Sequence, residues 1–330
     1  MRTHSQSTQL RKMRVPNGAV KGRRASYRKI PLHVRLFRCG SANGRNLHSH
    51  PSLSYTVQAP ADPGAIRVNP ISENRITRER RGHLLLLGLN RAAKRNAFDE
   101  PMLDELVLAL GDYERDPQLR CALIFAHGEH FTAGLDLANV SERFRNGWQL
   151  PSGAIDPWGT FGGPRLSKPL MVAAQGYCYT IGIELMLAAD ISLCASNARF
   201  AQMEVRRGIL PFAGATLRLP QVAGWGNAMR WLLTGDEFDA HEACRLGLVQ
   251  EVWAPEELLP AAIALAERIA SRAPLAVKAT LASARQAFDE GQEAAARALP
   301  AQAQALLASA DAREGLNAML EKREGNFSGN

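Results

Sequence analysis

The sequence predicts an α/β core followed by a C-terminal region of helices. Between residues 75 and 195, short apolar segments typical of strands alternate with turns and helical patterns. From residue 226 onward, almost every segment shows helical spacing and is rich in Ala and Leu. Residues 1–70, by contrast, have no sustained hydrophobic period. We therefore expect an N-terminal extension at 1–70, an α/β core at 71–255 and a helical region at 256–330.

The core is expected to contain five strands and two helices. The strands are short apolar runs bounded by turn residues, at 75–80, 83–90, 121–126, 169–174 and 191–195. A first helix is expected at 99–113, where apolar residues repeat at helical spacing after Asp99, a residue typical of an N-cap. A second helix is expected at 180–189, directly after a turn that contains glycine.

The C-terminal half is predicted to be helical throughout. Helices are expected at 226–234, 240–246, 255–271, 274–290, 292–310 and 312–324. Such a region is either a second domain or a surface that packs against a partner subunit.

Composition places the chain among globular proteins that do not span a membrane. Of the 330 residues, 46% are hydrophobic and 22% are charged. No run approaches the roughly 18 uninterrupted apolar residues of a membrane helix. The five cysteines are scattered, are odd in number and form no CxxC motif, so neither a disulfide framework nor a zinc site is expected. We therefore expect a reducing compartment, the cytoplasm, and no partnership with a membrane.

The net charge of +8 is divided unevenly along the chain. Residues 1–70 contain 13 Lys and Arg but one acid, Asp62, whereas the remaining residues contain 27 basic and 31 acidic side chains. The extension can be read as a basic arm for nucleic acid, as a transit peptide, or as an unstructured leader or over-extended start of translation. Aromatic residues are sparse in it, so we expect no nucleic-acid partner and favour the last interpretation.

Several common catalytic motifs are missing from the sequence. It has no GxSxG motif, no phosphate-binding P-loop, and no GxGxxG that opens a helix after a strand. It has instead three turns that come after predicted strands and carry acids: 131–136, 176–184 and 200–204. Taken singly, each has an ordinary structural explanation, such as a glycine required by a turn or an acid at a helix start. Together they predict a ligand site at one edge of the sheet.

In order, these motifs resemble those of one family. The runs LNRAAKRNAFD, FTAGLDL, GYCYTIGIELMLAADI, RFAQMEVRRGILP and LTGDEFDAHEACRLGLVQEV are similar to the crotonase superfamily, the enoyl-CoA hydratase/isomerase family. The resemblance extends over about residues 76–327. It implies a spiral of ββα units followed by a C-terminal helical region, which assembles homotrimers that often stack as hexamers.

The resemblance also implies the catalytic groups. The backbone N–H groups of Leu135 and Ile181 would stabilise a thioester enolate, Glu184 would activate water, and Glu204 would deliver a proton to C2. The chain departs from the family where the usual GGG reads Thr180-Ile181-Gly182. Because a β-branched residue does not readily adopt a positive φ, we expect this turn to use ordinary backbone angles.

Further residues are implied to bind the acyl-CoA thioester. Lys94, Arg95 and a C-terminal cation, Lys322 or Arg323, are candidates for the phosphates of CoA; the alternative for each is a solvated surface cation. The remaining candidates near the thioester are Ala133, Gly134, Asp136 and Gly182. Trp158 is a candidate for contact with the acyl group, as are Trp148 and Phe161 from the same Gly- and Pro-rich stretch; packing is the alternative for each.

The implied activity is that of an enoyl-CoA hydratase in fatty acid metabolism, a lyase that adds water to a trans-2-enoyl-CoA. Both glutamates are present, which favours hydration over the first alternative, a double-bond isomerase that relies mainly on Glu204. A second alternative is a non-catalytic acyl-CoA-binding protein, suggested by Ile181. The reaction would need neither a metal nor a separate cofactor, because coenzyme A is part of the substrate.

Overall fold

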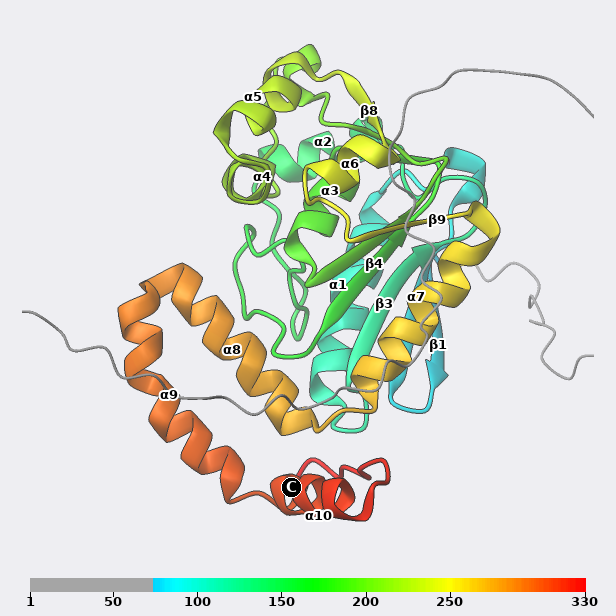
Figure 1. Ribbon diagram of the computed structural model, residues 1–330. Coiled ribbons are helices and arrows are strands. Elements are labelled where there is room, and N and C mark those ends of the chain that lie inside the picture. The colour runs from blue at the N-terminus through cyan, green and yellow to red at the C-terminus, as the bar shows by residue number, and fades with distance from the viewer. Residues whose placement is uncertain (1–73) are drawn as a thin grey trace, which may run out of the picture. The chain divides into compact units, whose positions relative to one another are not determined.

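The computed structural model describes residues 74–330 (Figure 1). The predicted extension at 1–70 lies outside the described residues. Within 74–330, no helix combines the length and the apolar character needed to cross a membrane.

A six-stranded sheet forms the centre of the described chain, in the order β1-β2-β3-β4-β6-β9. β1 pairs antiparallel with β2, and every subsequent pair is parallel. The strands are β1 Ile76–Arg81, β2 Leu84–Leu89, β3 Cys121–Ala126, β4 Leu170–Ala174, β6 Ile191–Ala195 and β9 Glu251–Trp253. The five predicted strands are thus present, and β9 was not anticipated.

Helices cover the sheet on two faces because its inner strands are apolar on both sides (Figure 1). In β2, Leu85, Leu87 and Leu89 pack in one cluster with α1 (Glu100–Arg115), whereas Leu84 and Leu86 pack in another with α7 (Pro255–Ala270). Asp99 caps α1 as predicted, since its Oδ1 accepts a hydrogen bond from the Met102 N–H at 3.1 Å.

A second, three-stranded sheet has the order β5-β7-β8, with β5 at Tyr177–Tyr179, β7 at Arg199–Ala201 and β8 at Glu237–Asp239. β5 leads directly into α3 (Ile181–Ala188), which matches the helix predicted at 180–189. The small sheet thereby fixes where α3 begins, and the candidate active site is built at this point.

The other helices surround this part of the chain. They are η1 Ala92–Lys94, α2 Leu137–Arg145, η2 Glu204–Arg207, α4 Ala215–Ala223, α5 Trp225–Thr234 and α6 Ala240–Arg245. The sequence did not predict α2 or α4. α2 buries Val140 alone, so its apolar stripe is too weak to recognise, and α4 contains Pro220, which reads as a helix breaker.

The C-terminal helices differ in how they are packed. α7 lies against the central sheet, whereas α8 (Pro274–Glu290), α9 (Gln292–Leu307) and α10 (Ala310–Glu321) bury few of their residues. Large apolar side chains on α9 and α10 are exposed, namely Leu299, Leu307, Leu316, Met319 and Leu320. The predicted α/β class and helical C-terminal region are confirmed.

Candidate active site

Two loops from separate parts of the sequence lie side by side at the site. A parallel bridge joins Thr132 to Cys178: the Thr132 N–H donates to the Tyr177 carbonyl at 2.8 Å, and the Tyr179 N–H donates to the Thr132 carbonyl at 3.1 Å. Leu135 and Ile181 each come three residues after this bridge. The equal offset brings both predicted donors to the lining of one cavity.

Hydrogen bonds around the first loop leave the Leu135 N–H open. The Phe98 N–H donates to the Gly134 carbonyl, and the Asp136 N–H donates to the Phe98 carbonyl, both at 2.9 Å. Gly134 has φ 101°, a conformation that favours glycine. Among the described residues, no acceptor is bonded to the Leu135 N–H, so this donor remains available to a ligand.

The second donor, the Ile181 N–H, begins α3. The first turn of a helix has no carbonyl for its N–H groups, and the helix dipole places partial positive charge there. The preceding residue, Thr180, has φ 52° and ψ −112°. Our expectation of ordinary backbone angles at this turn is therefore wrong, because the positive φ that glycine normally provides has moved onto Thr180 while Ile181 itself is helical.

Two buried glutamates line the same cavity. Glu184, one turn into α3 and 2% exposed, accepts a hydrogen bond at Oε1 from the Ala215 N–H at 3.1 Å. Glu204, at the start of η2 and 5% exposed, has a weak contact of 3.4 Å between its Oε1 and Gln202 Nε2. Its Oε2 has no hydrogen-bond partner among the described residues. One oxygen of Glu204 is thus available for a proton or a ligand.

Burial raises the pKa of both carboxyls to about 7, because the charged form is poorly solvated. The charge of Glu204 raises the pKa of Glu184 further, whereas Arg207 lowers the pKa of Glu204. Since Glu204 acts on Glu184, the two protons leave in successive steps, and the pKa of each step belongs to the pair rather than to one residue. Near neutral pH, the pair holds both a proton to give and a base to accept one.

The cavity has a volume of about 190 Å³. It brings together predicted residues from separate segments of the chain: Ala133, Leu135, Ile181, Glu184 and Glu204. Sequence reasoning missed the rest of its lining, which consists of Leu137, Thr180, Arg207, Ile209 and Phe212. Three of these, Arg207, Ile209 and Phe212, come within eight residues of Glu204. Two of them lie inside the run RFAQMEVRRGILP and the third directly follows it, so this segment was the available signal.

Two predicted binding residues have structural partners instead of facing the cavity. Asp136 forms an ion pair with Arg91, at 2.9 Å between Oδ2 and Nη2. Gly182 lies where α3 approaches the Thr132–Cys178 bridge, and a Cβ there would come within 3.1 Å of Cys178 Sγ. The glycine retained from the usual GGG is therefore explained by packing.

Trp158 is fully buried and does not line the cavity. Its indole Nε1 donates to the Ile181 carbonyl at 3.2 Å, and its ring packs in a cluster with Trp148 and Phe161. The cluster includes Phe212, which contacts Phe161 and does line the cavity. Trp158 thus contacts the residue of the second donor from outside the cavity and helps to hold the start of α3 in place.

The predicted CoA-binding cations are exposed and lie outside the cavity lining. Arg95 comes directly after η1, and its guanidinium lies 5.6 Å from the centre of the Tyr177 ring. The backbone carbonyl of Arg95 also accepts the N–H of Ala133 at 2.9 Å, so Arg95 stands beside the first donor loop. Lys322 directly follows α10, and Arg323 forms an ion pair with Glu314. Among the described residues, neither cation lines the cavity.

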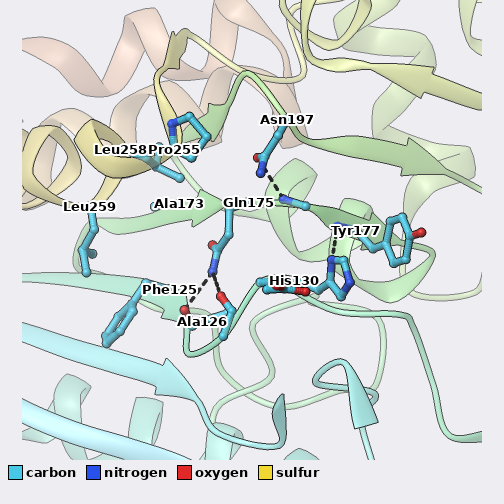
Figure 2. A pocket seen from close by; sticks show the side chains of 13 residues that line it. Phe125, Ala126, His130, Ala173, Gln175, Tyr177, Asn197, Pro255, Leu258 and Leu259 are labelled. Carbon is cyan, nitrogen blue, oxygen red and sulfur yellow. Dashed lines mark hydrogen bonds between the residues drawn. The ribbon is translucent and has the colours of Figure 1, made fainter. Parts of the chain in front are cut away.

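A second pocket, of about 520 Å³, is lined by residues whose hydrogen bonds hold the donor loops in place (Figure 2). The Gln175 amide donates to the carbonyls of Ala126 and Gly128 at 2.9 and 3.0 Å, and His130 Nδ1 accepts the Tyr177 N–H at 3.2 Å. These bonds tie the loop after β3 to the strand that leads into α3. The hydrogen bonds drawn in the figure therefore brace this part of the chain.

Comparison with known proteins agrees with this geometry. Residues 79–330 match the family described as enoyl-CoA hydratase/isomerase. The chain is 34% identical to the enoyl-CoA hydratase EchA19 of Mycobacterium tuberculosis, over 76% of this chain and 94% of that protein. It is 35% identical to a crotonyl-CoA hydratase of Syntrophomonas wolfei, over 76% and 96% of the two chains.

A solved structure is also similar. A probable enoyl-CoA hydratase/isomerase from Mycobacterium abscessus is 51% identical and aligns with a TM-score of 0.76, over 78% of this chain and 99% of the other. The fold and the site, with two backbone N–H donors and two buried glutamates in one cavity, define a crotonase-superfamily protein. Within that superfamily, the chain belongs to the enoyl-CoA hydratase/isomerase family, so the predicted resemblance is confirmed.

Proposed function

We propose that this protein is an enoyl-CoA hydratase that reversibly adds water across the C2=C3 bond of a trans-2-enoyl-CoA. The observation that carries the proposal is the pair of buried glutamates, each with a pKa near 7, beside two backbone N–H donors in one cavity. The relatives named enoyl-CoA hydratase and crotonyl-CoA hydratase support this class of reaction.

The two N–H groups supply the electrostatic part of the mechanism. The thioester oxygen accepts hydrogen bonds from Leu135 and Ile181, and negative charge grows on this oxygen as water attacks C3. Backbone donors fixed by the surrounding bonds need not reorganise during the reaction, and one such donor is worth about 100- to 1,000-fold in turnover.

The two carboxyls handle the protons. Glu184, held by the Ala215 N–H on one oxygen, accepts a proton from water as the oxygen of that water bonds to C3. Glu204, with its unbonded Oε2, gives a proton to C2 of the enolate. The C=C π bond and one O–H bond of water are lost, and one C–O and one C–H bond form. Proton exchange with solvent then returns Glu184 to its ionised form and Glu204 to its protonated form, so the reaction is balanced without a redox step, a metal or a separate cofactor.

The size of the cavity favours a short acyl group. A volume of about 190 Å³ is below the range of roughly 300–1,000 Å³ typical of pockets for larger ligands. Leu137, Ile209 and Phe212 add apolar surface suited to a short alkenyl chain. The CoA portion would lie outside this cavity, toward the loop that carries Lys94 and Arg95.

We further propose that the chain assembles with copies of itself, as a homotrimer or a hexamer. The large apolar side chains exposed on α9 and α10 support this, because apolar surface left open to solvent on such helices marks candidate protein–protein interfaces. In such an assembly, Lys322 and Arg323 would approach the site of a neighbouring copy. The setting we propose is cytoplasmic, and light scattering of the purified protein measures the assembly.

Turnover of a panel of enoyl-CoA substrates, with identification of the products, tests the activity. We expect 3-hydroxyacyl-CoA from crotonyl-CoA and declining turnover as the acyl chain lengthens. A product with a moved double bond would replace the hydratase by an isomerase. Tight binding of the thioester without any product would indicate a non-catalytic acyl-CoA-binding protein.

A further inference from the structure

Thr180 occupies a backbone conformation that nothing in the local structure requires of a threonine. Its φ of 52° is combined with a ψ of −112°, whereas Arg95 and Lys322, which also have positive φ, have ψ of 37° and 40° in the ordinary left-handed helical region. A β-branched residue at such angles is a genuine outlier. Glycine would adopt them freely, so the side chain must contribute something that offsets the strain.

The usual explanation for threonine before a helix does not apply. Thr180 is the N-cap of α3, yet its side chain makes no capping hydrogen bond. Its Oγ1 has no hydrogen-bond partner among the described residues. Thr132, in contrast, donates its hydroxyl to the Asn96 carbonyl at 2.7 Å. The Thr180 hydroxyl is therefore polar, uncommitted and held in place by a strained backbone.

The hydroxyl lies at the point where the two donor loops meet. Thr180 lines the cavity together with Leu135 and Ile181. A Cβ added at Gly134 would collide with Thr180 Oγ1, so this oxygen lies directly over Gly134. Gly134 precedes Leu135, and Thr180 precedes Ile181. The Thr180 hydroxyl thus lies against the residue that immediately precedes the Leu135 donor, and its own residue immediately precedes the Ile181 donor.

We propose that the Thr180 hydroxyl is a third hydrogen-bond donor to the thioester oxygen, alongside the N–H groups of Leu135 and Ile181. The inference rests on the proposed function only in taking an acyl thioester as the ligand. A hydroxyl can rotate to direct its proton at developing negative charge, and no acceptor among the described residues competes for that proton. Thr180 would then act as a catalytic residue, because it touches the reacting oxygen.

Three substitutions in the full-length protein separate the hydroxyl from the shape and the backbone of Thr180. Thr180→Ser keeps the hydroxyl, Thr180→Val keeps the shape without it, and Thr180→Gly removes both it and the backbone strain. We expect Ser to retain turnover within about 3-fold, and Val and Gly to lose about 10- to 100-fold in kcat with little change in KM, as for a donor that acts in the transition state.

The Thr180→Gly variant makes the sharpest test, because relief of backbone strain should raise stability while loss of the hydroxyl should lower turnover. Its melting temperature should equal or exceed that of the wild type, while its turnover falls. A Thr180→Gly protein as active as the wild type would overturn the proposal, and so would a Thr180→Val protein whose KM rises while kcat is unchanged. If Thr180→Val does not fold, the comparison of Ser with Gly decides the matter by itself.

A second measurement does not depend on hydration. Acetoacetyl-CoA forms a thioester enolate, and the absorbance of that enolate reports how strongly the bound oxyanion is stabilised. The enolate absorbance should persist with Thr180→Ser and weaken with Thr180→Val. If the wild type hydrates no enoyl-CoA but shows this pattern, the proposed function fails and the role of Thr180 stands. Equal enolate absorbance in all variants would overturn the role of Thr180 alone.

Discussion

The loop of Gly134 and Leu135 and the loop of Thr180 and Ile181 reach matching positions with different residues. In each, a residue of positive φ precedes the donor, and the donor comes three positions after the bridge. Glycine provides the turn in the first loop, and a strained threonine provides it in the second. The position of the N–H groups is therefore set by the surrounding hydrogen bonds rather than by glycine.

The loops also differ in the residues beyond the donor. Three residues after Ile181, the second loop places Glu184 in the cavity, whereas the corresponding residue of the first loop is Ala138, which is exposed. At these positions the first loop thus contributes only a backbone N–H donor to the cavity, whereas the second contributes a backbone N–H donor, the Thr180 hydroxyl and the Glu184 carboxyl. Substitutions at the position three residues after each donor should consequently have unequal effects.

The largest effect is expected from the acids. Glu184→Gln and Glu204→Gln keep the size of the side chain but cannot exchange a proton, so each should lower hydration by about 100-fold or more. Hydrogen exchange at C2 of a saturated acyl-CoA in deuterated water should survive Glu184→Gln better than Glu204→Gln. Native rates of hydration in Glu184→Gln would exclude the two-glutamate mechanism and favour an isomerase.

Removing each donor tests whether the loops share the oxyanion equally. Leu135→Pro and Ile181→Pro each delete one N–H, and proline is well accepted at the first position of a helix, where Ile181 lies. Each should reduce kcat by about 100-fold. Circular dichroism checks that both variants fold. A folded variant with near-native turnover would remove that residue from the mechanism.

The acid of the second loop should also impose a cost on stability that depends on pH. Glu184 has a pKa of about 7 in the folded chain against an ordinary value of 4.5, so the folded state holds more protons in between and stability falls as pH rises from about 4.5 to 7. At pH 8, Glu184→Gln should be more stable by about 1 kcal/mol or more, with no gain near pH 4.5. Urea unfolding at both pH values measures this, and Glu142→Gln, at an exposed residue of α2, is the control.

A double-mutant cycle can test the contact between the two loops. Gly134→Ala should destabilise the protein, because of its φ of 101° and because the new methyl meets Thr180 Oγ1. The same change should be less harmful in the Thr180→Gly background, with a coupling of about 1 kcal/mol. Strictly additive effects would mean that the hydroxyl does not lie over Gly134.

The smallest effect concerns a group outside both loops. Arg207 lines the cavity and lowers the pKa of Glu204, so Arg207→Ala should move the pH profile of kcat/KM upward by less than about one unit. Arg206→Ala is the matched control, since Arg206 donates to the Gly235 carbonyl instead. An unchanged profile for Arg207→Ala would show that this charge is screened by solvent.

Much of the fold could be predicted from local pattern. β3 and β6 begin and end where the apolar runs do, and α8 coincides with its helical pattern, because each is a long or continuous signal. The strands of the small sheet, β5, β7 and β8, have three residues each and were not found. Their pairing depends on tertiary contacts that no local pattern encodes.

The site divides in the same way. The motifs led to Glu184 and Glu204, and the structure places both in one cavity. The conformation of Thr180 could not be predicted from the sequence. A positive φ contradicts the intrinsic preference of a β-branched residue, so it arises only from the surrounding fold. For Trp158 the sequence left contact with the acyl group and packing open. Its indole is buried against the Ile181 carbonyl, a direction that spacing in an irregular loop does not encode.

The position of Trp158 suits its intrinsic fluorescence to reporting on the candidate active site. The indole N–H is bonded to the carbonyl of Ile181, and Trp148 and Phe161 surround the ring. Tryptophan emission responds to changes in hydrogen bonding and in neighbouring dipoles. We therefore expect a ligand that accepts a hydrogen bond from the Ile181 N–H, at the start of α3, to change the emission of Trp158. Occupancy of the site can thus be measured by fluorescence titration with unlabelled thioester, in variants that are catalytically silent.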